Sequence, residues 1–168
     1  EADANDVAVK VVLRNLLGGH SGLEINEGRC NANKAMARLV QDAIANFEAC
    51  LAEWKGGNMR NAIPREAEVV LTLPKENLPA LKEVVDEWRE TFVGEYGSIE
   101  KDLTLTVEEV ALPAHIVPAE IQDNLVNALC AAHNGVLRFI PEVPSIVETS
   151  SNLAIVEIGE GKAKFLIL

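Results

Sequence analysis

Residues 17–34 read LGGHSGLEINEGRCNANK and stand between an alternating apolar run and a long helical pattern. The stretch holds four glycines and one histidine, His20. Glycines at this density let the backbone adopt positive φ and approach another group closely, which is typical of a loop that holds a ligand or a polar contact at a helix entrance. We therefore expect His20 to be exposed and held by its loop. On the loop alone, a simple strand-to-helix connection in which His20 only caps or meets solvent explains the pattern equally well.

The segments on either side of this loop predict a strand and a helix. Apolar residues alternate from Val7 to Leu13, which is the period of a half-buried strand. After the loop, apolar residues recur at helical spacing from Met36 to Leu51, and this face includes Cys50 as a buried thiol. Asn31 or Asn33 would accept the first free amides of this helix as its N-cap.

The middle of the chain completes a βαββαβ order. The expected elements are a short strand at 53–57, a strand at 67–73 ended by Pro74, a helix opened by Asn77 and Pro79 and stopped by Gly94 and Gly97, and a strand at 103–107. This order lays two helices on one face of an antiparallel sheet.

The last third adds further elements to this core. Pro118 opens a third helix, whose buried side is expected to hold Ile121, Leu125, Ala128, Leu129 and Ala132. Residues 136–151 contain two prolines and are expected to be irregular, and residues 154–167 read as a hairpin. The predicted fold class is α+β, a two-layer sandwich: an antiparallel sheet with a βαββαβ (ferredoxin-like) core, plus an extra helix and a C-terminal hairpin. Residues 1–168 would form one domain.

Composition limits the classes of function. The chain of 168 residues carries a net charge of −11 and its lysines and arginines are scattered singly, so nucleic acid is not an expected partner. No run is apolar enough to span a bilayer, and no signal peptide opens the chain. Cys30, Cys50 and Cys130 are widely spaced, as is typical of reduced thiols. These features predict a cytoplasmic protein without membrane contact.

The histidines are not expected to form a metal site. His20, His115 and His133 lie in separate segments, and none has a partner at metal-binding spacing. We expect His115 to be solvated and His133 to interact with the dipole of the third helix. No GxSxG motif is present to activate a serine.

A second motif, GGNMRNAIP at residues 56–64, predicts a turn between two strands. Its Asn61 could offer a donor and an acceptor to a ligand. Equally, Asn61 could satisfy only the backbone of its own turn.

Four motifs taken together resemble a known family. GGHSG, NANK, GGNMRNAIPREA and VETSSN occur here in this order. The set resembles the zinc-dependent peptidase and amidohydrolase family of aminoacylase, carnosinase and carboxypeptidase G, and within it the aminoacyl-histidine (Xaa-His) dipeptidases. The resemblance covers nearly the whole chain.

The resemblance implies a division of labour between two domains. Members have a catalytic domain with two zinc ions and a glutamate base, and an inserted α+β lid or dimerisation domain, which this chain resembles. His20 matches the lid histidine that polarises the scissile carbonyl oxygen and stabilises the tetrahedral intermediate, and Asn61 matches an asparagine that contacts the substrate or that same oxygen. Arg138 would bind a substrate carboxylate. Where some relatives read EIH after the loop, this chain has Glu24-Ile25-Asn26.

The expected parent is a cytosolic dinuclear zinc dipeptidase that hydrolyses Xaa-His dipeptides such as carnosine. The chain itself would hold no cofactor and would be inactive alone, with its own catalytic domain, the dipeptide and a second copy as partners. The missing initial methionine and the apolar end KFLIL favour a piece of a longer protein. The alternative is a stand-alone, non-catalytic module that binds a ligand or another protein.

Overall fold

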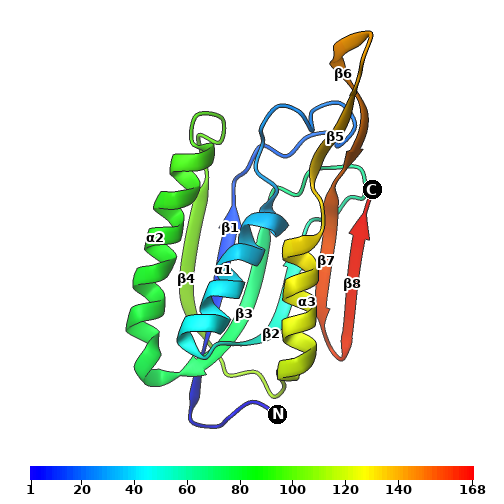
Figure 1. Ribbon diagram of the computed structural model, residues 1–168. Helices are drawn as coiled ribbons and strands as arrows, with labels where there is room; N and C mark the ends of the chain where they lie inside the picture. The colour runs from blue at the N-terminus through cyan, green and yellow to red at the C-terminus, as the bar shows by residue number, and fades with distance from the viewer.

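The computed structural model describes residues 1–168 as a six-stranded antiparallel sheet with three helices on one face, and a separate two-stranded ribbon (Figure 1). The elements are β1 (Asp6–Arg14), α1 (Ala32–Phe47), β2 (Cys50–Gly56), β3 (Ala67–Pro74), a 3-10 turn (Lys75–Asn77), α2 (Leu78–Tyr96), β4 (Thr104–Val110), α3 (Ala119–Ala131), β5 (Gly135–Ile140), β6 (Val143–Ser151), β7 (Leu153–Gly159) and β8 (Lys162–Ile167). None of the helices is long and apolar enough to cross a membrane.

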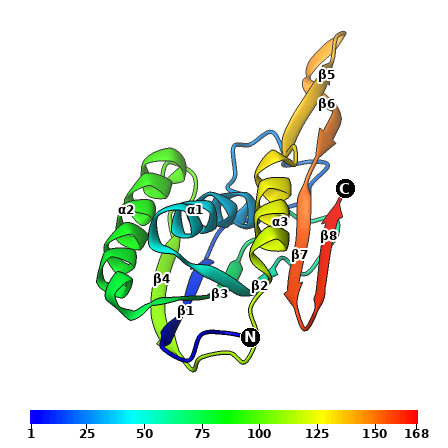
Figure 2. The ribbon, with the colours of Figure 1, turned by 60° about the horizontal axis from the view of Figure 1, so that its bottom comes forward.

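The strand order confirms the predicted fold class. The six strands lie in the order β4-β1-β3-β2-β7-β8, and the first four reproduce the βαββαβ core. The predicted C-terminal hairpin, β7 and β8, extends this sheet beyond β2. Figure 2 shows the three helices over the same face of the sheet.

The core lies between the sheet and the helices. Alternate residues of β1, Val9, Val11 and Leu13, are fully buried, as the period-two pattern predicts. The indole of Trp54 is also fully buried, and its Nε1–H donates to Asn33 Oδ1 at 3.1 Å, so the one polar atom of the ring has a partner.

The first helix is shorter than its apolar pattern predicts. It ends at Phe47, and its C-cap Glu48 takes a left-handed conformation with φ of 54°. Cys50 and Leu51 therefore open β2, and the prediction that they continue the helix is wrong. The apolar residues that open β2 happen to continue the helical spacing of α1. At the other end, Asn31 is the N-cap and its side chain accepts from Lys34 N.

The other two helices also differ in detail. The buried face of α3 is Gln122, Val126 and Leu129, so Ile121, which is 52% exposed, and Ala128 do not lie on the buried side. Gln122 faces inward because its Oε1 accepts the backbone N–H of Leu51 at 2.5 Å. In α2, Asn77 makes no side-chain cap, contrary to the prediction, and Gly94 lies inside the helix, which ends at Tyr96 with Gly97 as its C-cap.

Residues 135–151, here called the arm, form a hairpin of β5 and β6 rather than the predicted irregular segment. Figure 1 shows the arm projecting beyond the end of the main sheet. Its pairing shifts register three times, and most of its residues are exposed on both faces. Without one buried face, its sequence does not show the alternation that identifies a strand.

Candidate functional site

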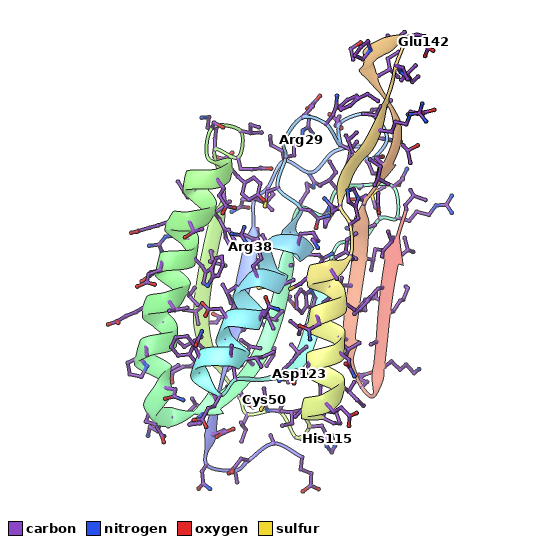
Figure 3. The ribbon with its side chains drawn as sticks, viewed as in Figure 1. Arg29, Arg38, Cys50, His115, Asp123 and Glu142 are labelled. Atoms are coloured by element: carbon purple, nitrogen blue, oxygen red, sulfur yellow. The ribbon has the colours of Figure 1, made fainter.

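The two glycine-containing motifs meet at the end of the sheet from which the arm projects. We call residues 15–31 the His20 loop and residues 57–66 the Asn61 loop. Between them lies a cleft of about 690 Å³, whose lining includes Leu17, His20, Glu24, Arg29, Asn58, Met59, Asn61 and Arg65. Figure 3 places Arg29 at this end of the molecule, whereas His115 and Cys50 lie at the opposite end.

Backbone hydrogen bonds join the two loops. Ser21 N–H donates to Asn61 O at 3.0 Å, and Ile63 N–H donates to Gly19 O at 2.8 Å. His20 and Ala62 form an isolated antiparallel bridge between them. The structure thus brings His20 and Asn61 to adjoining loops on one cleft, and both side chains are exposed.

The His20 ring has a defined orientation. Its Nδ1 accepts the backbone N–H of Gly22 at 3.0 Å. A neutral imidazole carries one hydrogen, so a ring whose Nδ1 accepts must carry it on Nε2. His20 therefore offers a neutral N–H donor.

A carboxylate and a guanidinium hold the same loop. Glu24 Oε2 accepts the backbone N–H of His20 at 2.6 Å, and Glu24 Oε1 accepts from Arg29 Nη2 at 2.6 Å. Arg29 Nη1 also donates to Gly18 O at 2.8 Å. The His20 N–H, followed by the positive charge of Arg29, lowers the pKa of the Glu24 carboxyl below its ordinary value.

Glu100, which is distant in the sequence, bonds both ends of the His20 loop. Its carboxylate is only 2% exposed, and it accepts the backbone N–H groups of Leu17 at 2.8 Å and Cys30 at 2.9 Å. One buried side chain therefore bonds both ends of the loop, and at Cys30 it satisfies a buried N–H.

The other motifs support the Asn61 loop. Asn152, from VETSSN, is fully buried, and its Nδ2 donates to Ala62 O at 2.9 Å. Its Oδ1 accepts from Asn31 Nδ2, which also donates to Asn134 Oδ1 at 2.8 Å. Asn33 Nδ2 donates to Gly56 O at 3.2 Å, and a Cβ on Gly56 would collide with that asparagine. The four motifs are therefore joined by hydrogen bonds, and GGHSG and GGNMRNAIPREA line the cleft.

Arg138 does not lie on the cleft. It is in β5 of the arm with its side chain 63% exposed, and it forms an ion pair with Glu148, with 2.7 Å between its Nε and Glu148 Oε2. His115 and His133 are both exposed. The end of α3 receives Lys34 instead of His133: the Nζ donates to the carbonyls of Leu129, Cys130 and Ala132 at 2.8, 2.7 and 2.6 Å.

The chain's own residues do not fit a metal ion. No group of three or more His, Cys, Asp or Glu side chains gathers in a way that could hold one. What the cleft presents is a pair of hydrogen-bond donors, the His20 ring from one loop and the Asn61 amide from the other. Such donors stabilise negative charge on a bound group but do not supply a nucleophile.

The residues that the sequence did not single out are those that hold the loops. Glu24, Arg29, Glu100 and Asn152 act on backbone groups, and no motif rule assigns them that part. Glu24 and Arg29 lie near His20 in the sequence. The available signal for their role was an acid and a base five residues apart within one glycine-rich loop. Glu100 is 83 residues from Leu17, and only the fold brings them together.

Comparisons with known proteins agree with this architecture. The sequence profile of the M20 peptidase dimerisation domain matches residues 11–100. The cytosol non-specific dipeptidase of Escherichia coli K12 is 34% identical over 155 residues, which are 92% of this chain and 32% of that protein. The crystal structure of aminoacylhistidine dipeptidase from Vibrio alginolyticus has a TM-score of 0.95 and 38% identity, covering 99% of this chain and 34% of that one. The chain spans about a third of the length of these two relatives.

Proposed function

Because the chain belongs to the family of M20 peptidase dimerisation domains, we propose that it is the lid and dimerisation domain, residues 1–168, of a larger metallo-dipeptidase. In this proposal it supplies substrate-binding and oxyanion-stabilising groups to a catalytic domain that lies elsewhere in the parent protein. The single observation that carries the proposal is the exposed His20 ring, whose neutral N–H is fixed on a cleft by the Gly22 amide.

His20 is the proposed catalytic residue. When a nucleophile adds to the scissile carbonyl, the oxygen gains negative charge that the substrate does not yet carry. A neutral N–H held in place before the reaction stabilises that oxygen more than it stabilises the substrate, and one such donor contributes about 3 to 4 kcal/mol. His20 lies in a loop, outside the helices and the strands of the sheet.

Asn61 and Arg138 are the proposed substrate-binding residues. The Asn61 side chain is exposed on the same cleft, so its amide could donate to the substrate or to the same oxygen. The arm carries Arg138 away from the cleft and pairs it with Glu148. For Arg138 to bind a substrate carboxylate, that ion pair must open and the arm must lie against the catalytic domain.

The two zinc ions of the proposed parent would be held outside this chain. The described residues lack a donor set for a metal, so the chain alone should neither retain zinc nor hydrolyse a dipeptide. Bound zinc would polarise the scissile carbonyl and activate water. The residues of this chain would act on the substrate and on the developing oxyanion.

The proposed substrates are dipeptides of the Xaa-His class, such as carnosine. The Vibrio alginolyticus relative is named for aminoacylhistidine, and this supports that class. The Escherichia coli relative is named non-specific, so a comparison of kcat/KM across Xaa-His and other dipeptides would define the range. That relative is also named cytosolic, which supports a cytoplasmic location for the parent, and we propose that the parent is a homodimer.

The experiment is a pair of histidine variants in the full-length peptidase. His20→Ala should lower kcat by at least about a hundredfold while the metal content stays the same, because one oxyanion donor is lost. His115→Ala is the matched control, since His115 is also exposed but lies at the opposite end of the domain (Figure 3). An unchanged kcat in His20→Ala would show that His20 is a solvated loop residue without a catalytic role.

A further inference from the structure

We infer that Glu24 and Arg29 form a clamp that positions His20, so that its ring presents the Nε2–H to the cleft. This inference rests on the proposed function of His20 for its catalytic consequence, but its structural part stands on the contacts of the loop itself. Neither residue is expected to touch the reacting atoms, so both are positioning residues.

The first observation is that the clamp grips the backbone of His20 directly. Glu24 spans the loop with both oxygens: one accepts the His20 N–H, and the other accepts from Arg29, each at 2.6 Å. The carbonyls and amides around it are also engaged, since Leu23 N–H and Glu24 N–H both donate to His20 O. The backbone at His20 is therefore bonded on both sides of its Cα.

The second observation is that Arg29 is held on several sides. Its side chain is 17% exposed, and it donates to Gly18 O as well as to Glu24 and Glu27. A surface ion pair of two long, free side chains contributes little, but a guanidinium with several fixed acceptors loses less freedom for each bond formed. Arg29 thus ties the start of the glycine run to the carboxylate.

The third observation is that the loop makes room for the clamp. Gly19 has φ of +121°, and a Cβ there would collide with Arg29 Nη1 and Glu24 Oε2. A side chain at this position would displace the pair, so the glycine serves the clamp as well as the turn.

The clamp affects the tautomer of His20 through the hydrogen bond from Gly22. The Gly22 N–H reaches Nδ1 only if the turn from His20 to Glu24 keeps its shape. The clamp joins the two ends of that turn through the Glu24 side chain, beside the backbone bond from the Glu24 N–H to His20 O. If the turn opens, Nδ1 loses its donor and the neutral ring is free to carry its hydrogen on either nitrogen. The donor in the cleft would then be present for only part of the time.

Nitrogen NMR of the histidine side chains in the 168-residue chain tests the structural part. In the wild type we expect the Nε2–H tautomer at His20, and in Glu24→Ala a mixture of tautomers with His20 amide exchange at least about tenfold faster. Glu95→Ala is the matched control, because it removes a carboxylate that also accepts from an arginine but does not line the cleft. Glu95 accepts from Arg38 at 2.6 and 2.8 Å. This variant should leave both readouts unchanged.

Glu24→Gln keeps the inference testable if Glu24→Ala does not fold. His20 and Arg29 donate to different oxygens of Glu24, and in glutamine one of these two positions is an NH₂ group that cannot accept, so one of the two bonds is lost and an intermediate shift of both readouts is expected. A folded Glu24 variant with the wild-type tautomer and wild-type exchange at His20 would overturn the clamp.

Kinetics in the full-length peptidase test the catalytic consequence. Glu24→Ala should lower kcat about tenfold with little change in KM, and it should cost nothing further in a His20→Ala background, because it acts through His20. An equal further loss in that background would overturn the positioning role. A lost tautomer with unchanged kcat would support the clamp and overturn the proposed role of His20.

Discussion

Cys30 ends the His20 loop as a fully buried thiol beside the carboxylate of Glu100. Burial, followed by the negative charge of Glu100, raises the pKa of Cys30 from 9.0 to about 12. A thiol in this environment stays neutral, which makes it a poor nucleophile. We interpret Cys30 as a packing residue of the loop base.

The raised pKa predicts a loss of stability in alkaline solution. The folded state keeps the Cys30 proton that the unfolded chain releases above pH 9, so this contribution is complete below pH 9 and is lost as the pH rises toward 12. The free energy of unfolding should fall by up to roughly 1.4 kcal/mol per pH unit over this range. Urea unfolding of the wild type and Cys30→Ala at several pH values gives the slopes. Parallel curves for the two proteins would contradict the prediction.

Residue patterns predicted that His20 and Asn61 lie in loops, but not what holds those loops. His20 and Asn61 stand in glycine-containing motifs whose composition indicates exposed loops, and the structure places both at the cleft. Glu100 and Asn152 could not be predicted in the same way. Their partners are backbone groups 70 to 90 residues away, and a local pattern carries no record of which distant amide a side chain will meet.

Among the helices, Lys34 links the start of α1 to the C-terminal end of α3. It lies in the first turn of α1, and its ammonium bonds three carbonyls at the end of α3. A cation at this position also interacts favourably with the helix dipole. Since the arm follows α3 directly, this contact fixes the point from which the arm projects.

Lys34→Met should therefore weaken the fold more than the loss of an ordinary surface lysine. The change keeps the length of the side chain, and we expect a loss of about 1 to 3 kcal/mol in the free energy of unfolding from the carbonyls left without their donor. Lys101→Met is the matched control, because Lys101 is exposed and bonds only Gly97 O at the end of α2. Chemical unfolding followed by circular dichroism measures both. Equal losses would show that the contact with α3 does not stabilise the fold.

Elements with one buried face were predictable, and elements without one were not. The period-two pattern of β1 and the turn glycines between β7 and β8 are determined by local sequence, and the structure confirms them. The arm and the face of α3 depend on tertiary contacts. Gln122 is turned inward by the Leu51 amide, and the arm exposes apolar residues such as Leu137 and Phe139, so hydrophobicity alone gives the wrong answer for both.

At the scale of the whole molecule, the sheet leaves two free edges, β4 and β8, for association. The profile of the dimerisation domain covers residues 11–100, which include all of α2 but neither edge strand, and α2 packs beside β4. We therefore expect a dimer built on the side of α2 and β4. Repulsion at −11 per chain opposes it, although physiological salt screens charges beyond about 8 Å.

Two matched variants test this assignment. Val93 on α2 and Ile167 on β8 are 49% and 50% exposed, so a glutamate at either costs a similar amount in the folded monomer. In sedimentation at micromolar concentration and physiological salt, the wild type and Ile167→Glu should be dimers and Val93→Glu a monomer. A monomeric wild type, or dissociation by Ile167→Glu alone, would contradict the expected interface.

In the proposed function, His20 supplies the parent enzyme with a donor that acts on the transition state and not merely on the substrate. A group of that kind affects a transition-state analogue far more than a substrate. The measurement is the inhibition constant of a phosphinate analogue of the dipeptide, compared with the substrate KM, in wild-type and His20→Ala full-length peptidase. The prediction is a loss of about a hundredfold for the phosphinate with KM nearly unchanged. Equal losses for phosphinate and substrate, or no loss for either, would contradict it.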